Sequence, residues 1–191
     1  KTAEMSKLME NTYRDVNIAL ANELAMICNR LDINVHEVIE MANKHPRVNL
    51  HTPGPGVGGH CLAVDPYFII AEAPEESPLI QLSRSINVSM PEYVVGITKD
   101  IIAKLNGNKV TVFGLTYKGD VDDIRESPAF DIYELLRKEE GIEVNTYDPH
   151  VKMDFVEKDL AKAVSDSSLV LVLSDHSEFK TLTDGEFSTM K

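Results

Sequence analysis

The sequence predicts an α/β protein in which an all-helical central domain is joined by a long helix to a partial, Rossmann-like parallel α/β domain. Apolar residues recur every three or four positions through 2–31 and again through 78–105, the period of amphipathic helices. After residue 105, short runs rich in Val and Ile alternate with helical segments, the pattern of parallel strands with crossover helices. We therefore predict domains at 1–105 and 106–191.

The helical domain opens with a helix over 2–31. The residues that share its apolar face are Met5, Met9, Tyr13, Val16, Leu20, Leu24, Ile27 and Leu31. A short helix at 34–43 and an irregular segment at 44–64 follow. Asp65 and Ser77 each precede a proline, which predicts that they cap two helices. The second of these runs to Leu105, with a kink near Pro91.

Three strands are predicted in the α/β domain, at 109–115, 142–147 and 168–174. A helix that starts at Ser127-Pro128 and ends at Gly141 connects the first two, and a weaker helix at 159–164 connects the others. Three strands make a thin sheet, so we expect this domain to be incomplete. The chain also begins without Met and directly in a helical pattern, which suggests a fragment of a longer protein.

Composition narrows the class of partner. The 191 residues include 19 Lys and Arg against 31 Asp and Glu, a net charge of −12. Such a surface repels phosphate backbones and anionic lipids, so we expect no nucleic-acid and no membrane partner, whereas a small anionic ligand could still use a local basic pocket. The two cysteines fit neither a disulfide framework nor a zinc site, and we expect a reduced, cytoplasmic protein.

The segment "PGPGVGGHCLAVDP" at 53–66 contains a G-x-G-x-x-G pattern. A dinucleotide-binding loop of this type must follow a strand and open a helix, but the preceding "KHPRVNLHT" does not have the pattern of a strand. Pro55 also removes one amide N–H. The sequence therefore excludes a dinucleotide loop here and leaves a tight glycine turn or a loop that presents Cys61.

Cys61 has two interpretations. A lone cysteine is most often a small buried hydrophobe, and Cys28, beside the apolar face of the first helix, fits that pattern. Cys61 instead lies in a loop just before a helix start, where the helix dipole and a nearby cation would lower its pKa and favour a thiolate. Both interpretations stay open on the residues alone.

Lys7, Asn11 and Arg14 lie on one face of the first helix, nearly opposite the apolar stripe. A solvated face is the ordinary meaning of such a trio. The same stripe continues through apolar residues, which suggests that it is covered and that the trio contacts a ligand: Ile18, Ala21 and Ala25. A desolvated lysine near a cysteine can exchange a proton and stabilise an alkoxide.

The segment "GLTYKGDVDDIRESPA" at 114–129 is a long loop between a strand and a helix, where open α/β sheets bind ligands. Lys118 and Arg125 are its cations. Its three aspartates lack a regular metal-ligand spacing, so we expect them to be paired or solvated: Asp120, Asp122 and Asp123. His150 and His176 are interpreted as turn residues.

Three motifs, "SKLMENTYRDVNIALANELA", "PGPGVGGHCLAVDPYF" and "GLTYKGDVDDIRESPA", resemble the UDP-glucose/GDP-mannose dehydrogenase family in order and across essentially the whole chain. The N-terminal Rossmann domain of that family and the last strand of its C-terminal domain have no counterpart in these residues. The resemblance implies an NAD-dependent, four-electron oxidation of a UDP-sugar at C6 through a cysteine thiohemiacetal and thioester.

The resemblance also implies roles for individual residues. Cys61 matches the nucleophile, and Lys7 the lysine that exchanges a proton and stabilises the oxyanion together with Asn11. Asp65 matches the carboxylate that helps to activate water. Arg14 would contact the sugar. The remaining substrate positions are Gly58, which leaves room for the substrate, and Tyr117 and Lys118, which would hold the uracil nucleotide.

His45 and Arg47 match positions that reach into a partner subunit's site, which implies a homodimer through the helical domain. Arg125 matches the arginine that contacts NAD. Two other readings stay open: the chain alone as a non-catalytic nucleotide-sugar-binding and dimerisation module, which we expect to be inactive, and a scaffold with no site.

Overall fold

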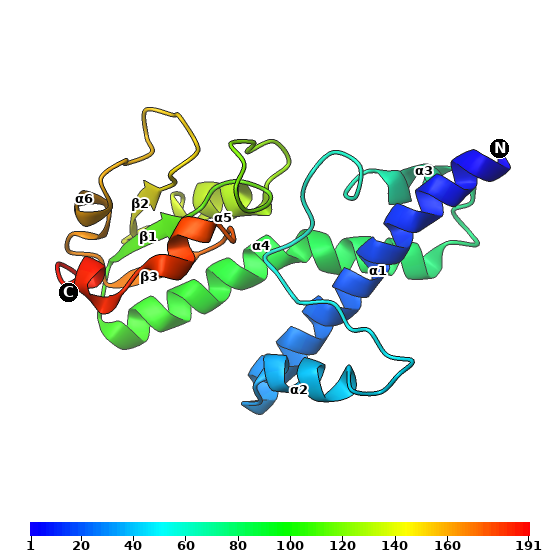
Figure 1. Cartoon of the computed structure of the whole chain (residues 1–191), viewed down its shortest axis with the longest axis horizontal. Helices are drawn as coiled ribbons and strands as arrows, with labels where there is room; N and C mark the ends of the chain where they lie inside the picture. The colour runs from blue at the N-terminus through cyan, green and yellow to red at the C-terminus, as the bar shows by residue number, and fades with distance from the viewer. The chain divides into compact units, whose positions relative to one another are not determined.

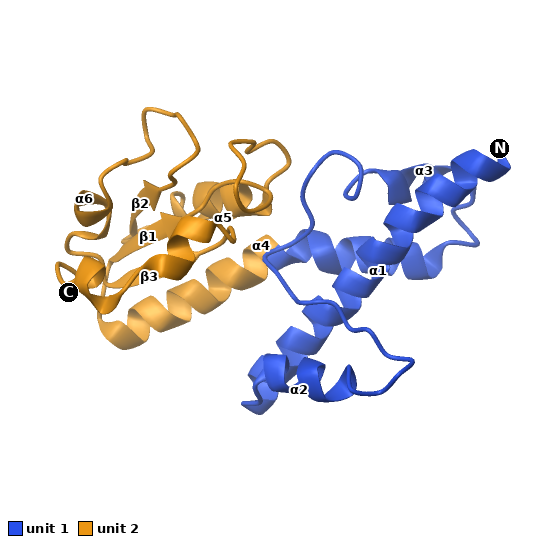
Figure 2. Ribbon diagram, viewed as in Figure 1, with its two compact units in different colours: residues 1–90 blue, residues 91–191 orange.

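The computed structural model describes all residues, 1–191, and they form two compact units, 1–90 and 91–191 (Figure 2). The first unit contains α1 (Thr2–Leu31), α2 (Val35–Ala42), α3 (Asp65–Glu72) and the beginning of α4 (Pro78–Leu105) (Figure 1). The boundary between the units lies inside α4 at Pro91, which has no N–H to donate along the helix. The predicted division at residue 105 stays a prediction.

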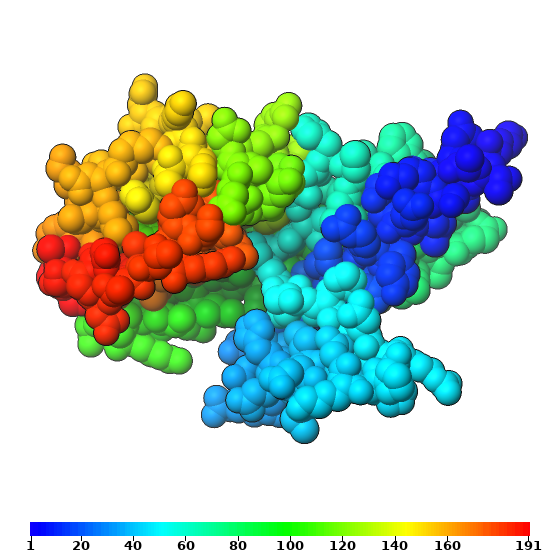
Figure 3. Space-filling view, in the orientation of Figure 1, coloured from blue at the N-terminus to red at the C-terminus, as the bar shows by residue number.

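The predicted apolar face of α1, the helix drawn in blue in Figure 3, is largely exposed within this chain. Its exposed members are Met5, Met9, Tyr13, Leu20, Ile27 and Leu31. The buried residues of α1 are instead mostly small or polar: Asn11, Thr12, Asp15, Ala19, Ala21, Asn22 and Cys28. The spacing of apolar residues thus predicted the helix correctly but not the face that packs against its neighbours. That face is polar because Asn11 and Asp15 contact polar residues of α3 and α4. Cys28 is buried, as predicted.

A buried polar network fixes α1 against its neighbours. The Asp15 carboxylate pairs with the guanidinium of Arg84 on α4 and accepts a hydrogen bond from Asn87 Nδ2 at 2.9 Å. Asn87 Oδ1 accepts from Asn22 Nδ2 at 2.9 Å, and Asn22 Oδ1 accepts from the Gly54 backbone N–H at 2.9 Å. The network therefore connects α1, α4 and the glycine-rich segment.

Two of the predicted helix bounds are wrong. Val64, rather than Asp65, is the N-cap of α3, and Asp65 is the first residue of the helix, with its carboxylate engaged elsewhere. The helix predicted to end at Gly141 ends at Leu136. Gly141 lies in the following turn at a φ of 83°, a backbone conformation that glycine adopts without strain.

The second unit contains a three-stranded parallel sheet in the order β2-β1-β3, which confirms the predicted fold class. The strands are β1 (Lys109–Phe113), β2 (Glu143–Tyr147) and β3 (Leu169–Val172). The helices are α5 (Pro128–Leu136) and α6 (Leu160–Val164), followed by the short 3-10 helices η1 (Ser177–Thr181) and η2 (Asp184–Phe187).

The core of the second unit lies around the central strand β1. Val110 and Val112 are fully buried and pack with Leu115, Ile132 and Leu136. Because all three strands are parallel, the segments that follow them emerge at one edge of the sheet. This arrangement brings together the loop after β1, the turn after β2 and the segment after β3. No helix of the protein combines the length and apolar character needed to cross a membrane.

Candidate functional site

Cys61 lies exposed in the turn that leads into α3. Its carbonyl oxygen accepts hydrogen bonds from the backbone N–H groups of Val64, at 3.2 Å, and Asp65, at 2.9 Å. Upstream, Gly56 and Gly59 have φ values of 139° and 85°, which a residue with a side chain rarely adopts. The glycines therefore shape the turn. The exposure of Cys61 excludes the interpretation of this residue as a buried hydrophobe.

Asn11 and Asp65 meet across the first unit, although 54 positions separate them in the sequence. Asn11 Nδ2 donates a hydrogen bond to Asp65 Oδ2 at 2.5 Å, and Asn11 is only 6% exposed. Asp65 is also tied by its backbone to the Cys61 turn. The structure thus brings α1 to the same turn that presents the cysteine.

Lys7 and Arg14 are exposed on either side of the buried Asn11. The Lys7 ammonium group lies 3.0 Å from the Glu10 carboxylate, and both side chains are well solvated. The predicted trio is therefore divided: Asn11 is covered, whereas the two cations lie at the surface and can reorient toward a ligand. Farther along this face the covered stripe is as expected, since Ala21 is buried and Ile18 is half-buried.

His45 and Arg47 follow α2 and are exposed. The Arg47 backbone N–H donates to His45 Nδ1 at 3.2 Å. In Figure 1, α2 lies beside the C-terminal end of α1, whereas α3 lies along its N-terminal half. His45 and Arg47 thus follow the helix at the C-terminal end of α1, whereas Cys61 precedes the helix along its N-terminal half (Figure 1). Gly58, in contrast, lies in the Cys61 segment and is half-buried.

The loop between β1 and α5 carries the candidate residues of the second unit. The Lys118 ammonium lies 5.6 Å from the centre of the Tyr117 ring, and the Tyr117 N–H donates to the Asp123 carbonyl at 3.3 Å. Asp123 also accepts two hydrogen bonds from the Arg125 guanidinium, at 2.9 and 2.7 Å, which raise the pKa of Arg125. Asp123 is thus paired, as predicted.

Arg125 is the one residue of the chain for which the resemblance implies a contact with NAD. Its side chain is 70% exposed, and a guanidinium suits a pyrophosphate oxygen. Arg125 therefore fits a peripheral contact with the cofactor, made in competition with Asp123.

Sequence reasoning missed two buried groups near these sites. His176 was predicted to be a turn residue, but its backbone is extended at the N-cap of η1, its ring is fully buried, and so is the carboxylate of Asp148 that it contacts. The Asp15–Arg84 pair of the first unit was also missed. The sequence contains only a weak indication that Asp148 and His176 are buried. Each of them follows a strand, where buried polar residues can hold loops in place.

The exposed cysteine turn, the Asn11–Asp65 contact and the parallel sheet with its long β1–α5 loop are those of a nucleotide-sugar dehydrogenase. Residues 1–89 match the central domain of the UDP-glucose/GDP-mannose dehydrogenase family, and residues 111–191 match the UDP binding domain of the same family. The chain belongs to this family, which confirms the resemblance that the motifs indicated.

Solved structures support the same assignment. The chain is 76% identical to the UDP-N-acetyl-mannosamine dehydrogenase Cap5O from Staphylococcus aureus, with a TM-score of 0.94 over 99% of this chain and 45% of that one. It is 45% identical to UDP-D-ManNAc dehydrogenase from Pyrococcus horikoshii, with a TM-score of 0.92 over 100% of this chain and 46% of that one.

A curated relative, the UDP-N-acetyl-D-mannosamine dehydrogenase of Methanocaldococcus jannaschii, is 54% identical over 182 residues, which are 94% of this chain and 42% of the relative. The chain thus spans less than half the length of the relatives that it matches.

Proposed function

We propose that the whole protein to which these residues belong oxidises UDP-N-acetyl-D-mannosamine to UDP-N-acetyl-D-mannosaminuronate. The observation that carries the proposal is the exposed Cys61 in a turn whose next polar residue, Asp65, is held by Asn11 of another helix. The names of the most similar relatives support the choice of sugar. NAD, when bound by the whole protein, would accept a hydride in each of two oxidations.

Cys61 would act as the nucleophile. Its sulfur adds to the C6 aldehyde formed by the first oxidation and gives a thiohemiacetal; the second oxidation gives a thioester, which water cleaves to the acid and the free thiol. Lys7 would leave Glu10 and, as the uncharged amine, take the proton of the C6 alcohol; the resulting ammonium would then stabilise the oxyanion on that oxygen.

Asn11 and Asp65 would act together. An amide NH₂ group has two donors, so Asn11 can bond Asp65 with one and the developing oxyanion with the other. The hydrogen bond to Asp65 fixes the orientation of that amide before substrate binds. The second carboxylate oxygen of Asp65 can accept a proton from the water that cleaves the thioester.

The remaining candidates would bind the substrate and the cofactor. In the first unit, Arg14 would contact the sugar and Gly58 would leave room for it. In the second unit, Tyr117 and Lys118 would hold the uracil nucleotide, which agrees with the match of this unit to a UDP binding domain. Arg125 would contact NAD.

We also propose a homodimer through the helical unit. His45 and Arg47 follow α2 rather than the segment before α3 that presents Cys61, so they would serve the site of a partner subunit rather than their own. The exposed apolar face of α1 offers surface for a second copy.

A second candidate concerns the 191 residues alone. Only the central and UDP binding domains of the family are matched, so this chain by itself would be a non-catalytic nucleotide-sugar-binding and dimerisation module.

The test is to count NADH released per sugar by the whole protein with UDP-ManNAc, UDP-GlcNAc, UDP-glucose and GDP-mannose. We expect two NADH with UDP-ManNAc and no acid from Cys61→Ser, while Cys28→Ala, at the other cysteine, retains the two-NADH stoichiometry. Two NADH per sugar with UDP-GlcNAc or UDP-glucose instead would support Cys61 as the nucleophile and change only the proposed substrate. One NADH per sugar, or acid formation by Cys61→Ser, would refute the thioester mechanism.

A further inference from the structure

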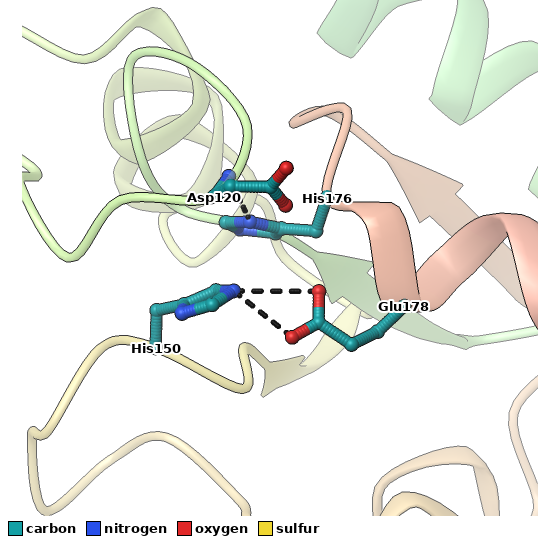
Figure 4. A group of neighbouring side chains, drawn as sticks. All are labelled: Asp120, His150, His176 and Glu178. Carbon is teal, nitrogen blue, oxygen red and sulfur yellow. Dashed lines mark hydrogen bonds and ion pairs between the residues drawn. The ribbon is translucent and has the colours of Figure 1, made fainter.

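Four potential metal ligands gather after the strands of the second unit. One ligand atom from each of Asp120, His150, His176 and Glu178 lies within 4.8 Å of the others. Figure 4 shows the His176 ring with Asp120 on one side and His150 and Glu178 on the other. Both ring nitrogens of His176 are already engaged by protein groups, which argues against a metal centre and raises the question of what this buried ring holds.

The hydrogen bonds of His176 fix one tautomer. The backbone N–H of Asp120 donates to Nδ1 at 2.9 Å, so Nδ1 carries no proton. In a neutral ring the proton is then on Nε2, which lies 3.2 Å from Asp148 Oδ2 and donates to it. His176 and Asp148 are both fully buried.

Asp148 is itself held rigidly. It accepts hydrogen bonds from the backbone N–H groups of Leu115, at 2.8 Å, His150, at 2.8 Å, and Val151, at 3.0 Å. These donors belong to the segment after β1 and the turn after β2. His176 therefore connects a fixed anchor at the end of β2 to the backbone of the β1–α5 loop.

The rest of that loop lies against the segment after β3. Asp120 Oδ1 accepts from the Ser177 N–H at 2.8 Å and from its hydroxyl at 2.9 Å, and the Ser174 hydroxyl donates to the Thr116 carbonyl at 2.6 Å. A Cβ atom on Gly119 would lie 2.0 Å from the Asp175 carbonyl oxygen, so only glycine permits this approach. The loop is thus fastened at Thr116 and at Asp120.

Tyr117 and Lys118 lie between these two fastened positions. We propose that His176 is a positioning residue for UDP: through Nδ1 and the Asp120 backbone it holds the loop in the conformation in which Tyr117 and Lys118 receive the nucleotide. This inference rests on the proposed UDP-binding role of those two residues. When the Asp120 N–H loses its acceptor, the loop is no longer held in the binding conformation. Part of the free energy of UDP binding is then used to order the loop, and UDP affinity falls by about tenfold.

Two variants separate the hydrogen bond of Nδ1 from the contacts of Nε2, which lies 3.4 Å from Thr116 Oγ1 as well as near Asp148. In His176→Asn, the amide oxygen takes the place of Nδ1 and retains the acceptor for the Asp120 N–H. In His176→Gln, the amide nitrogen takes the place of Nε2 and retains the donor to Asp148. The two replacements are both uncharged amides, so a general loss of packing would affect them alike, and thermal melting checks that each remains folded.

The experiment measures UDP binding to the whole protein by calorimetry and amide hydrogen exchange of the peptide that contains Asp120. We expect His176→Asn to bind within about threefold of the unaltered protein with the peptide still protected, whereas His176→Gln binds about tenfold more weakly and exchanges faster. Lys118→Ala, which removes a proposed direct contact, should weaken UDP binding and leave the exchange unchanged.

Equal UDP affinity in the two His176 variants, or an equally protected Asp120 peptide, would overturn the positioning role while the UDP site stands. Failure of the unaltered protein to bind UDP would instead refute the proposed UDP site, and with it this role for His176. If a His176 variant does not fold, Ser177→Ala is measured instead. This substitution removes the hydroxyl donor to Asp120 and should also weaken UDP binding; unchanged UDP affinity would overturn the proposal that the fastened loop supports the nucleotide.

Discussion

Removal of Arg84 should strongly destabilise the helical unit. The Asp15 and Arg84 side chains are 0% and 7% exposed, and they form an ion pair between α1 and α4. In Arg84→Met the long side chain is replaced by an apolar one, and the Asp15 carboxylate keeps only the hydrogen bond from Asn87. A buried charge that loses its partner costs about 3–5 kcal/mol of folding free energy.

That loss is large for this unit. A domain of such size is typically stable by roughly 5–13 kcal/mol, at about 0.05–0.15 kcal/mol per residue. Arg84→Met should therefore remove roughly a quarter or more of the stability of residues 1–90. The double variant Asp15→Asn, Arg84→Met has no buried charge and should recover at least half of the loss.

The effect should also depend on pH. Burial raises the pKa of Asp15, and Arg84 opposes that rise. A carboxyl group whose pKa is higher in the folded state binds its proton more tightly when the protein is folded. The ionised carboxylate therefore lowers the stability of the fold above the folded-state pKa, and protonation restores this stability as the pH falls through that pKa. Without Arg84 the rise is unopposed, so the deficit of Arg84→Met should shrink between pH 7 and about pH 4–5.

The assay is urea unfolding followed by far-UV circular dichroism, with hydrogen exchange of α1 to assign the transition to the first unit. Arg30→Met, at an exposed arginine of α1, is the control and should change stability by less than about 1 kcal/mol. A loss below about 1 kcal/mol in Arg84→Met, or a deficit that grows on acidification, would refute the reasoning.

Three further predictions follow from single positions. Gly96→Ala adds a Cβ that meets nothing within 4 Å on an exposed face of α4, so unfolding should require about 0.5–1 kcal/mol more in urea titrations. Gly119→Ala forces the backbone away from Asp175 and should lower both the melting temperature and UDP affinity. Gly96→Ala is the control and should lower neither the melting temperature nor UDP affinity. Asn11→Ala should lower kcat of the whole protein by about 10²–10³-fold in NADH assays, and unchanged turnover would exclude Asn11 from oxyanion stabilisation.

Local patterns predicted most of the elements. The bounds of α1 and α4 agree with the sequence because apolar periodicity marks both helices and Pro78 marks the start of α4. The strands and their parallel arrangement followed from the alternation of Val-rich runs with helices. Cys61 was singled out because it lies outside any periodic face.

Pairings between distant residues could not be predicted. Asp15 and Arg84 are 69 positions apart, and nothing near either residue indicates its partner. The exposure of the apolar stripe of α1 was missed for the same reason, since periodicity does not say which surface is covered within one chain. His176 has the local sequence of a turn, and only the meeting of three strand ends explains why its ring is buried.

The different environments of the two thiols give this protein a built-in chemical reporter. Cys61 is exposed whereas Cys28 is buried, so an alkylating reagent should modify one sulfur in the folded chain and both in denaturant. The mass of the alkylated chain then shows whether the protein is folded, without any substitution in the sequence. Because the accessible sulfur is also the proposed nucleophile, the rate of its modification in the presence of different UDP-sugars reports directly which of them occupies the turn.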